Sequence, residues 1–182
     1  TPVVTTQYTV TGTSSLGCTS TRTVTVQIIP NPTVTATATP VVICAGNSST
    51  STGTRATNYT WTPASLTGSN VVVSPTTTTT YTLIGSNAQC LSNATTVQVV
   101  VNPTPTMVLN TVGSPTICSG STITIVAQNV SSATLIPGPI IGGVVFQVSP
   151  SVTTIYTVTG SNGFGCTNTK TVQINVNPTP TI

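Results

Sequence analysis

Residues 155–176 read IYTVTGSNGFGCTNTKTVQINV, and residues 7–28 read QYTVTGTSSLGCTSTRTVTVQI. In each stretch, two runs of alternating apolar and polar residues flank a short segment rich in Gly, Ser and Asn. This alternation is typical of half-buried strands, and the segment between the runs has the composition of a turn. Thr and Val are abundant throughout the chain, and both favour strands because they branch at Cβ. The sequence therefore predicts an all-β fold.

The same pattern occurs three times in the 182 residues. Its tyrosines lie 73 and 75 residues apart, and a cysteine follows each of them after nine or ten residues: Tyr8 and Cys18, Tyr81 and Cys90, Tyr156 and Cys166. Pro-rich segments recur at similar spacings of 71 and 75 residues, at Pro32, Pro103 and Pro178. Such a period suits a row of small domains better than a solenoid, whose units span about 20 to 50 residues.

The register of the repeat predicts one half-domain and two whole domains. Residues 1–32 match only the second half of a repeat and are called the half repeat. Residues 33–103 form a complete middle repeat, and residues 104–182 form the last repeat with the start of a further linker. Short strands separated by turns indicate antiparallel β-sandwiches, joined here as beads on a string by stiff Pro-rich linkers. In the middle repeat we expect strands near 33–39, 48–53, 57–62, 70–74, 79–85 and 95–101.

The charged residues are three in number, Arg22, Arg55 and Lys170, and the chain has no Asp, Glu or His. It therefore lacks the groups for acid–base catalysis and for calcium or magnesium binding, so we predict no catalytic, cofactor-binding or metal-binding residues. A net charge of +3 is too small for nucleic-acid binding. No apolar run reaches the roughly 18 to 20 residues of a membrane helix, so membrane insertion is not expected. Because the chain opens at Thr1, without Met or a signal segment, we expect a processed product or a piece of a longer polypeptide.

Five cysteines are an odd number, and the repeat accounts for it. Each complete repeat holds one early and one late cysteine, which predicts the disulfides Cys44–Cys90 and Cys118–Cys166. Cys18 is a late cysteine whose early partner would lie before Thr1, so it is expected to be unpaired. A metal site is the alternative, but no repeat holds four ligands and no CxxC spacing occurs. Disulfides point to an oxidising, extracellular location.

The order of these motifs resembles a known family. In the middle repeat the motifs are Ile43-Cys44-Ala45-Gly46, Asn58-Tyr59-Thr60-Trp61-Thr62-Pro63, Val73-Ser74-Pro75 and Val101-Asn102-Pro103; in the last repeat they are Ile117-Cys118-Ser119-Gly120, Val148-Ser149-Pro150 and Val176-Asn177-Pro178. The chain resembles the bacterial immunoglobulin-like (PKD-like) repeats of large surface proteins of Bacteroidota. The resemblance implies tandem immunoglobulin-like sandwiches, export by the type IX secretion system, and a role as an adhesin, gliding-associated protein or extracellular filament. The last repeat departs from the pattern, because Ile136 aligns with Trp61 and Pro137-Gly138-Pro139 follows it.

The aromatic residues have a structural and a binding interpretation. We expect Tyr8, Tyr81 and Tyr156 to be core strand tyrosines whose hydroxyls cap a corner of each sandwich. A ladder that stacks on sugars is the alternative for them. Of Tyr59 and Trp61, we expect only one, Trp61, to fill the core, whereas a carbohydrate platform would require it to be exposed.

The remaining polar candidates also have interpretations that involve no binding or catalysis. Arg22 and Lys170 occupy one repeat position and are expected to protect strand edges. An isopeptide bond is the alternative for Lys170, but it requires a carboxylate that the chain lacks. Arg55 is expected to be solvated. Four asparagines begin Asn-x-Ser/Thr sequons and are candidates for glycans: Asn47, Asn58, Asn93 and Asn129. The alternative is chance, because a chain so rich in Asn, Ser and Thr produces such sequons often.

Two classes of function fit these features. The first is a non-catalytic structural segment of a secreted filament or surface appendage, whose partners are copies of itself. The low charge favours it, because little repulsion keeps copies apart and strand edges rich in Val and Thr can pair. The second is a stalk or binding module of an adhesin that attaches to cell-surface glycans. Both place the protein outside the cell or on its surface.

Overall fold

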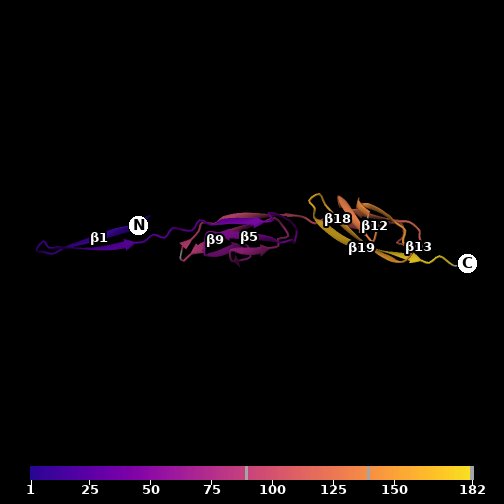
Figure 1. The fold of residues 1–182 in the computed structure, drawn as a ribbon. Helices are drawn as coiled ribbons and strands as arrows, with labels where there is room; N and C mark the ends of the chain where they lie inside the picture. Colours follow the sequence, from indigo (N-terminus) through magenta and orange to yellow (C-terminus); the bar gives the residue numbers. More distant parts are fainter. Residues whose placement is uncertain (89, 139, 181–182) are drawn as a thin grey trace. The chain divides into compact units, whose positions relative to one another are not determined.

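The computed structural model describes residues 1–88, 90–138 and 140–180. Every regular element in these residues is a β-strand (Figure 1). Within the same ranges, no helix is long and apolar enough to cross a membrane. The all-β class predicted from the alternating runs is thus confirmed.

The middle repeat folds into two sheets. The smaller sheet has the strand order β3–β5–β8, and the larger has the order β4–β11–β9–β6–β7, with β10 paired to β9. Most pairs are antiparallel, but β4 runs parallel to β11. The strands are β3 (Thr35–Thr39), β4 (Val42–Cys44), β5 (Ser49–Thr54), β6 (Asn58–Thr62), β7 (Leu66–Thr67), β8 (Asn70–Val73), β9 (Thr79–Asn87), β10 (Cys90–Leu91) and β11 (Thr95–Asn102).

The last repeat has the same topology. Its smaller sheet has the order β12–β14–β17, and its larger sheet has the order β13–β19–β18–β15–β16. Here too, one pair of strands is parallel, namely β13 with β19. The strands are β12 (Val108–Val112), β13 (Thr116–Cys118), β14 (Ile123–Gln128), β15 (Ser132–Ile136), β16 (Ile140–Gly143), β17 (Val145–Val148), β18 (Thr154–Ser161) and β19 (Thr167–Asn177).

The half repeat consists of one antiparallel pair, β1 (Thr6–Thr13) and β2 (Thr19–Val26). Its register matches that of β18 and β19, because Tyr8 lies opposite Val24 just as Tyr156 lies opposite Val172. The half repeat therefore has the same strand pairing as the final hairpin of the last repeat. Tyr8, which we expect in a core, is exposed, since no second sheet among the described residues packs against these two strands.

Alternate residues of the strands form the cores. In the last repeat, one cluster joins both sheets: Met107, Ile123, Ile125, Ala127, Ala133, Leu135, Phe146, Val148, Tyr156, Val158 and Ile174. In the middle repeat, the buried residues include Trp61, Leu83 and Val99, and two serines, Ser49 and Ser51. The Ser49 hydroxyl donates to the Pro40 carbonyl oxygen at 2.7 Å, whereas the buried Ser51 hydroxyl has no hydrogen-bond partner among the described residues.

Two details of the predicted core are corrected by the structure. Tyr59 and Trp61 are both buried, because side chains two residues apart in a strand share one face. Leu135, rather than Ile136, occupies the position of Trp61. Trp61 lies opposite Leu83 and Leu135 lies opposite the equivalent Val158, while Ile136 is exposed.

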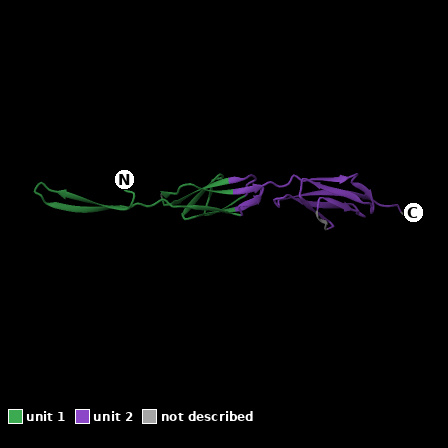
Figure 2. Ribbon diagram, turned by 90° about the horizontal axis from the view of Figure 1, so that it is seen from above, with its two compact units in different colours: residues 1–39, 50–73, 80–98 green, residues 40–49, 74–79, 99–182 purple. Residues whose placement is uncertain are grey.

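The chain divides into two compact units (Figure 2). The first comprises residues 1–39, 50–73 and 80–98, and the second comprises residues 40–49, 74–79 and 99–182. The second unit thus contains the whole last repeat together with the short segment that carries Cys44. This grouping places an early cysteine of one repeat with a late cysteine of the next.

Candidate functional site: a disulfide between repeats

A disulfide joins Cys44 of the middle repeat to Cys166 of the last repeat, with 5.5 Å between their Cα atoms. Strand β4 positions Cys44, because its parallel pairing with β11 sets this cysteine opposite Asn102. Cys166 is fully buried and ends the turn between β18 and β19. The bond therefore closes at the point where the chain leaves β11 and enters the last repeat.

The predicted disulfides Cys44–Cys90 and Cys118–Cys166 are wrong. Cys118 lies opposite Asn177 at the end of β19, whereas Cys166 immediately precedes the first residue of the same strand. An 11-residue strand rising about 3.3 Å per residue separates the two cysteines by roughly 36 Å. A disulfide needs Cα atoms within about 7 Å. The two cysteines of one repeat thus lie at opposite ends of its sandwich, and Cys18, Cys90 and Cys118 are free thiols.

Hydrogen bonds hold the linker between the two repeats against the same turn and the start of β19. The side-chain amide of Asn162 donates to the Pro103 carbonyl oxygen at 2.8 Å, and that of Asn168 donates to the Pro105 carbonyl oxygen at 2.9 Å. The side-chain oxygen of Asn162 accepts from the backbone N–H of Cys166 at 3.1 Å, which fixes the cysteine in the turn. The site is uncharged and is built from amides, prolines and the disulfide.

Cys118 occupies a copy of the Cys44 position. The residue after each cysteine donates its N–H to the end of the neighbouring strand: Ala45 to Asn102 and Ser119 to Asn177, both at 2.9 Å. The following glycine also donates to a proline carbonyl in each case, Gly46 to Pro75 at 3.2 Å and Gly120 to Pro150 at 3.1 Å. Cys118 is exposed and unpaired. The last repeat thus has, beside the end of β19, the same early-cysteine half of a disulfide site that the middle repeat has beside the end of β11.

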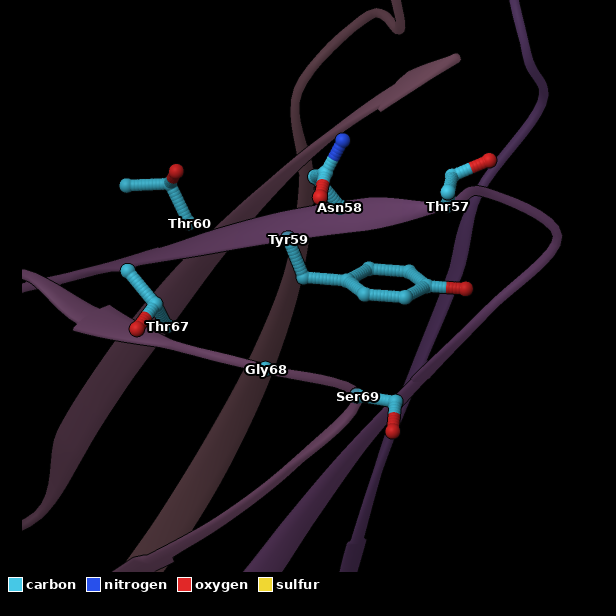
Figure 3. A pocket seen from close by; sticks show the side chains of 7 residues that line it. All are labelled: Thr57, Asn58, Tyr59, Thr60, Thr67, Gly68 and Ser69. Atoms are coloured by element: carbon cyan, nitrogen blue, oxygen red, sulfur yellow. The ribbon is translucent and has the colours of Figure 1, made fainter.

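A polar pocket of about 390 Å³ lies beside β6 and β7 (Figure 3). It is lined by Thr57, Asn58, Tyr59, Thr60, Thr67, Gly68 and Ser69, none of which is charged. The Tyr59 hydroxyl donates to the Ala56 carbonyl oxygen at 2.7 Å and accepts from the Ala56 N–H at 2.9 Å. Tyr59 therefore makes the kind of corner hydrogen bond that was expected of the repeated tyrosines. The pocket offers hydroxyl and amide groups to a ligand, but the aromatic ring of Tyr59 is largely buried.

The other predicted aromatic residues lie as follows. Trp61 is fully buried, and its indole N–H donates to the Gly68 carbonyl oxygen at 3.0 Å. Tyr81 and Tyr156 are buried as well, and desolvation raises the pKa of each phenol above 10.0. None of these three rings is accessible to a sugar.

The polar candidates are all on the surface. Arg22, Arg55 and Lys170 are exposed, and the four sequon asparagines are exposed too: Asn47, Asn58, Asn93 and Asn129. Among the described residues, no three potential metal-ligating side chains come together.

Comparison with known proteins gives structural likenesses only. No family model matches the chain, and no curated protein matches it. An ice-binding adhesin of an Antarctic bacterium aligns with 98% of this chain and 58% of its own length, at 17% identity and a TM-score of 0.42. The eight N-terminal Ig domains of Down Syndrome Cell Adhesion Molecule align with 96% of this chain and 27% of their own length, at 12% identity and a TM-score of 0.43. A 1.5-MDa bacterial ice-binding adhesin covers 95% of this chain and 74% of its own length, at 14% identity and a TM-score of 0.39.

Proposed function

We propose that the chain is a non-catalytic structural segment of a large secreted protein that builds an extracellular filament or surface appendage. The observation that carries this proposal is the Cys44–Cys166 disulfide, which joins one repeat to the next. A bond within a sandwich would stabilise one domain only. A bond between repeats fastens a row of domains together, which is the property that a tension-bearing stalk requires.

The disulfide changes how a pulling force travels along the chain. Tension applied at the two ends enters at Cys44 and leaves at Cys166, so the chain between these two cysteines, a sequence separation of 122, is bypassed. At about 3.3 to 3.6 Å per extended residue, roughly 400 Å of chain is thereby prevented from being drawn out. Both sandwiches are largely enclosed in this loop. The appendage would therefore keep its length under load even when a sandwich unfolds.

The surface chemistry supports assembly from copies of the same protein. With a net charge of +3 and no acidic residue, copies have little electrostatic repulsion to overcome. Strand edges rich in Val and Thr can pair with another chain. On this proposal residues 1–32 are the C-terminal half of a domain, residues 33–103 are a whole domain, and residues 104–182 are a further domain with the start of the next linker. These units are arranged as beads on a string, and the partners are further copies.

The resemblance to PKD-like repeats supports a location at the cell surface of a member of the Bacteroidota, after export by the type IX system. The inter-repeat disulfide fits an oxidising extracellular compartment, where such bonds persist. The role in this setting is attachment, with the repeats serving as the shaft of the appendage.

Sedimentation of the oxidised chain over a range of concentrations, with electron microscopy of the same samples, tests the proposal. A structural segment should self-associate into fibres with contacts that bury more than about 1,000 Å². A chain that stays monomeric at millimolar concentration and binds a glycan would instead support the second candidate, an adhesin module. The uncharged pocket beside Tyr59 is the one observation that favours this alternative. Its test is a glycan-binding assay with Asn58→Ala, and with Thr50→Ala outside the pocket as control.

A further inference from the structure

The hairpin of the half repeat exposes a face that is buried elsewhere in the same protein. Tyr8 and Val10 are 44% and 63% exposed, whereas the equivalent Tyr156 and Val158 are 6% and 0% exposed. On the paired strand, Val24 and Val26 are 55% and 38% exposed, and the equivalent of Val26, Ile174, is fully buried. The two hairpins share their register, so the difference lies only in what covers the face.

The last repeat shows what covers such a face. Strand β15 adds antiparallel to β18 along Ser132–Ile136, and β13 adds parallel to the end of β19. Residues of β12, β14 and β17 then close the core from the opposite sheet. All of these strands come from the first half of a repeat. The face of β1 and β2 is therefore complementary to a first half-repeat, a segment that the half repeat itself does not contain.

Cys90 is placed to bond the early cysteine of such a first half-repeat, as Cys166 bonds Cys44. Its sulfur lies 3.7 Å from the Ile29 carbonyl oxygen, just as the Cys166 sulfur lies 3.8 Å from the Asn102 carbonyl oxygen. Ile29 and Asn102 are equivalent, because each lies 21 residues after the repeated tyrosine (Tyr8 and Tyr81) and immediately before a proline. Asn102 faces Cys44, and Asn177, which is Ile29 shifted by 148 residues, faces Cys118.

At the Asn102 position the early cysteine is present and the disulfide has formed. At the Ile29 position the late cysteine is in place but is a partly exposed free thiol. A pocket of about 390 Å³ lies beside it, lined by Gln27, Ile28, Ile29, Ala88 and Cys90. Cys90 is thus not an isolated thiol, because the same chain contains a second copy of its surroundings with the bond made.

We propose that the β1–β2 hairpin and Cys90 together form a docking site for the first half of another repeat, sealed by a disulfide to its early cysteine. The occupant is a polypeptide of the same pattern as residues 33–78, with strands that cover Tyr8, Val10, Val24 and Val26. Its cysteine lies opposite Ile29, as Cys44 lies opposite Asn102.

The bond forms by two steps of thiol–disulfide exchange with a low-molecular-weight disulfide as the oxidant. The Cys90 thiolate attacks the oxidant and releases one thiol, giving a mixed disulfide. The thiolate of the occupant then attacks the Cys90 sulfur and releases the second thiol. The two protein thiols are oxidised by two electrons in total, and the oxidant is reduced to two thiols. This site goes beyond the proposed shaft function, because it operates with one chain and one segment, whether or not fibres form.

The test adds a synthetic peptide of residues 33–78 to the intact chain in oxidised and reduced glutathione. Peptide mapping by mass spectrometry then locates the cross-links of the peptide's Cys44. We expect the cross-link to Cys90 to exceed those to Cys18 and Cys118 by at least tenfold. Equal yields at the three free cysteines would overturn the proposal, as would preferential exchange into Cys166 or preferential Cys90–Cys90 dimers.

Two variants separate docking from thiol reactivity. The double substitution Val10→Lys and Val24→Lys leaves Cys90 untouched but places two charges on the face to be covered, so the Cys90 cross-link should fall at least tenfold. A matched control, Thr9→Lys with Thr23→Lys, places the charges on the opposite face and should retain most of the yield. If both double variants cross-link equally well, the hairpin face is not the docking surface.

Discussion

In the middle repeat, β6 contributes the large buried side chains Tyr59 and Trp61, whereas the equivalent strand β15 of the last repeat contributes Ala133 and Leu135. In the opposite sheet, the middle repeat has the smaller buried side chains and the last repeat has the larger ones. Strand β5 of the middle repeat buries Ser49, Ser51 and Gly53, and the equivalent β14 buries Ile123, Ile125 and Ala127. Phe146 of the last repeat likewise stands where the middle repeat has Val71.

This difference shows that the fold specifies a total core volume rather than particular residues. Interiors are close-packed, and they tolerate substitutions that keep the summed volume constant. A large residue on one sheet must therefore face small residues on the other. Gly53 shows how tightly this holds, because a Cβ atom there would lie 2.8 Å from Leu83 Cδ2 and 2.9 Å from Tyr59 Cδ1. The last repeat has room for Ala127 at the Gly53 position because Ala133 stands there in place of Tyr59.

The largest expected effect concerns the bond that ties the two repeats together. The double substitution Cys44→Ser and Cys166→Ser should lower the free energy of unfolding by about 5 kcal/mol, the chain-entropy value for a loop of this length. Urea denaturation of the oxidised chain measures it, and separate transitions for the two repeats should appear. Cys118→Ser, at a free and exposed thiol, is the control and should change stability little. A similar loss in the control would show that the junction bond has no special role.

The second prediction concerns the side chain that distinguishes the two cores most. Trp61→Leu, which introduces the residue of the last repeat, should destabilise the middle repeat by about 3 kcal/mol because it leaves a cavity. Adding Val71→Phe should recover part of the loss, since Phe146 holds that position in the last repeat. Denaturation followed by circular dichroism measures both. An exposed control, Ile136→Ala, should cost less than about 0.5 kcal/mol. No recovery in the double variant would contradict the volume argument.

A double-mutant cycle at Gly53 examines a close contact between the two sheets of the middle repeat. Gly53→Ala should cost about 2 kcal/mol, because the added methyl group overlaps Leu83 and Tyr59. In a Tyr59→Ala background the same change should cost less, since the ring is gone and the added methyl group then overlaps Leu83 alone. Additive costs in the cycle would mean that the strain at Gly53 does not come from Tyr59.

The smallest effect is a pH dependence shared by both repeats. Burial raises the pKa of Tyr81 and Tyr156 above the unfolded value of 10.0, so the folded state favours the protonated phenols. Their contribution is fully present below pH 10 and is lost as the pH rises beyond it. Melting temperatures of the thiol-alkylated chain between pH 8 and 11 should therefore fall above pH 10. Phenylalanine at both positions should flatten this fall, and an unchanged profile would assign it to other groups.

Much of the fold follows from local patterns in the sequence. Alternation of β-branched and polar residues locates the long strands, as in Thr79–Asn87 and Thr95–Asn102, because such runs can bury one face and hydrate the other. The three-residue strand β4 was not predicted, since Val42–Cys44 is too short to show a period. This omission mattered for the site, because β4 is the strand that carries Cys44 to the end of β11.

The sequence by itself determined the all-β class, the repeat and its late and early cysteines. Only the tertiary structure decided how those cysteines pair, that Tyr59 and Trp61 are buried together against small residues, and that Tyr8 lies exposed. Spacing along the chain cannot separate a partner within one repeat from a partner in the next. The length of β19 decides the pairing, because Cys166 precedes its first residue and Cys118 lies opposite its last, far beyond the reach of a disulfide. The turn before β19, which carries Cys166, instead lies against the preceding repeat.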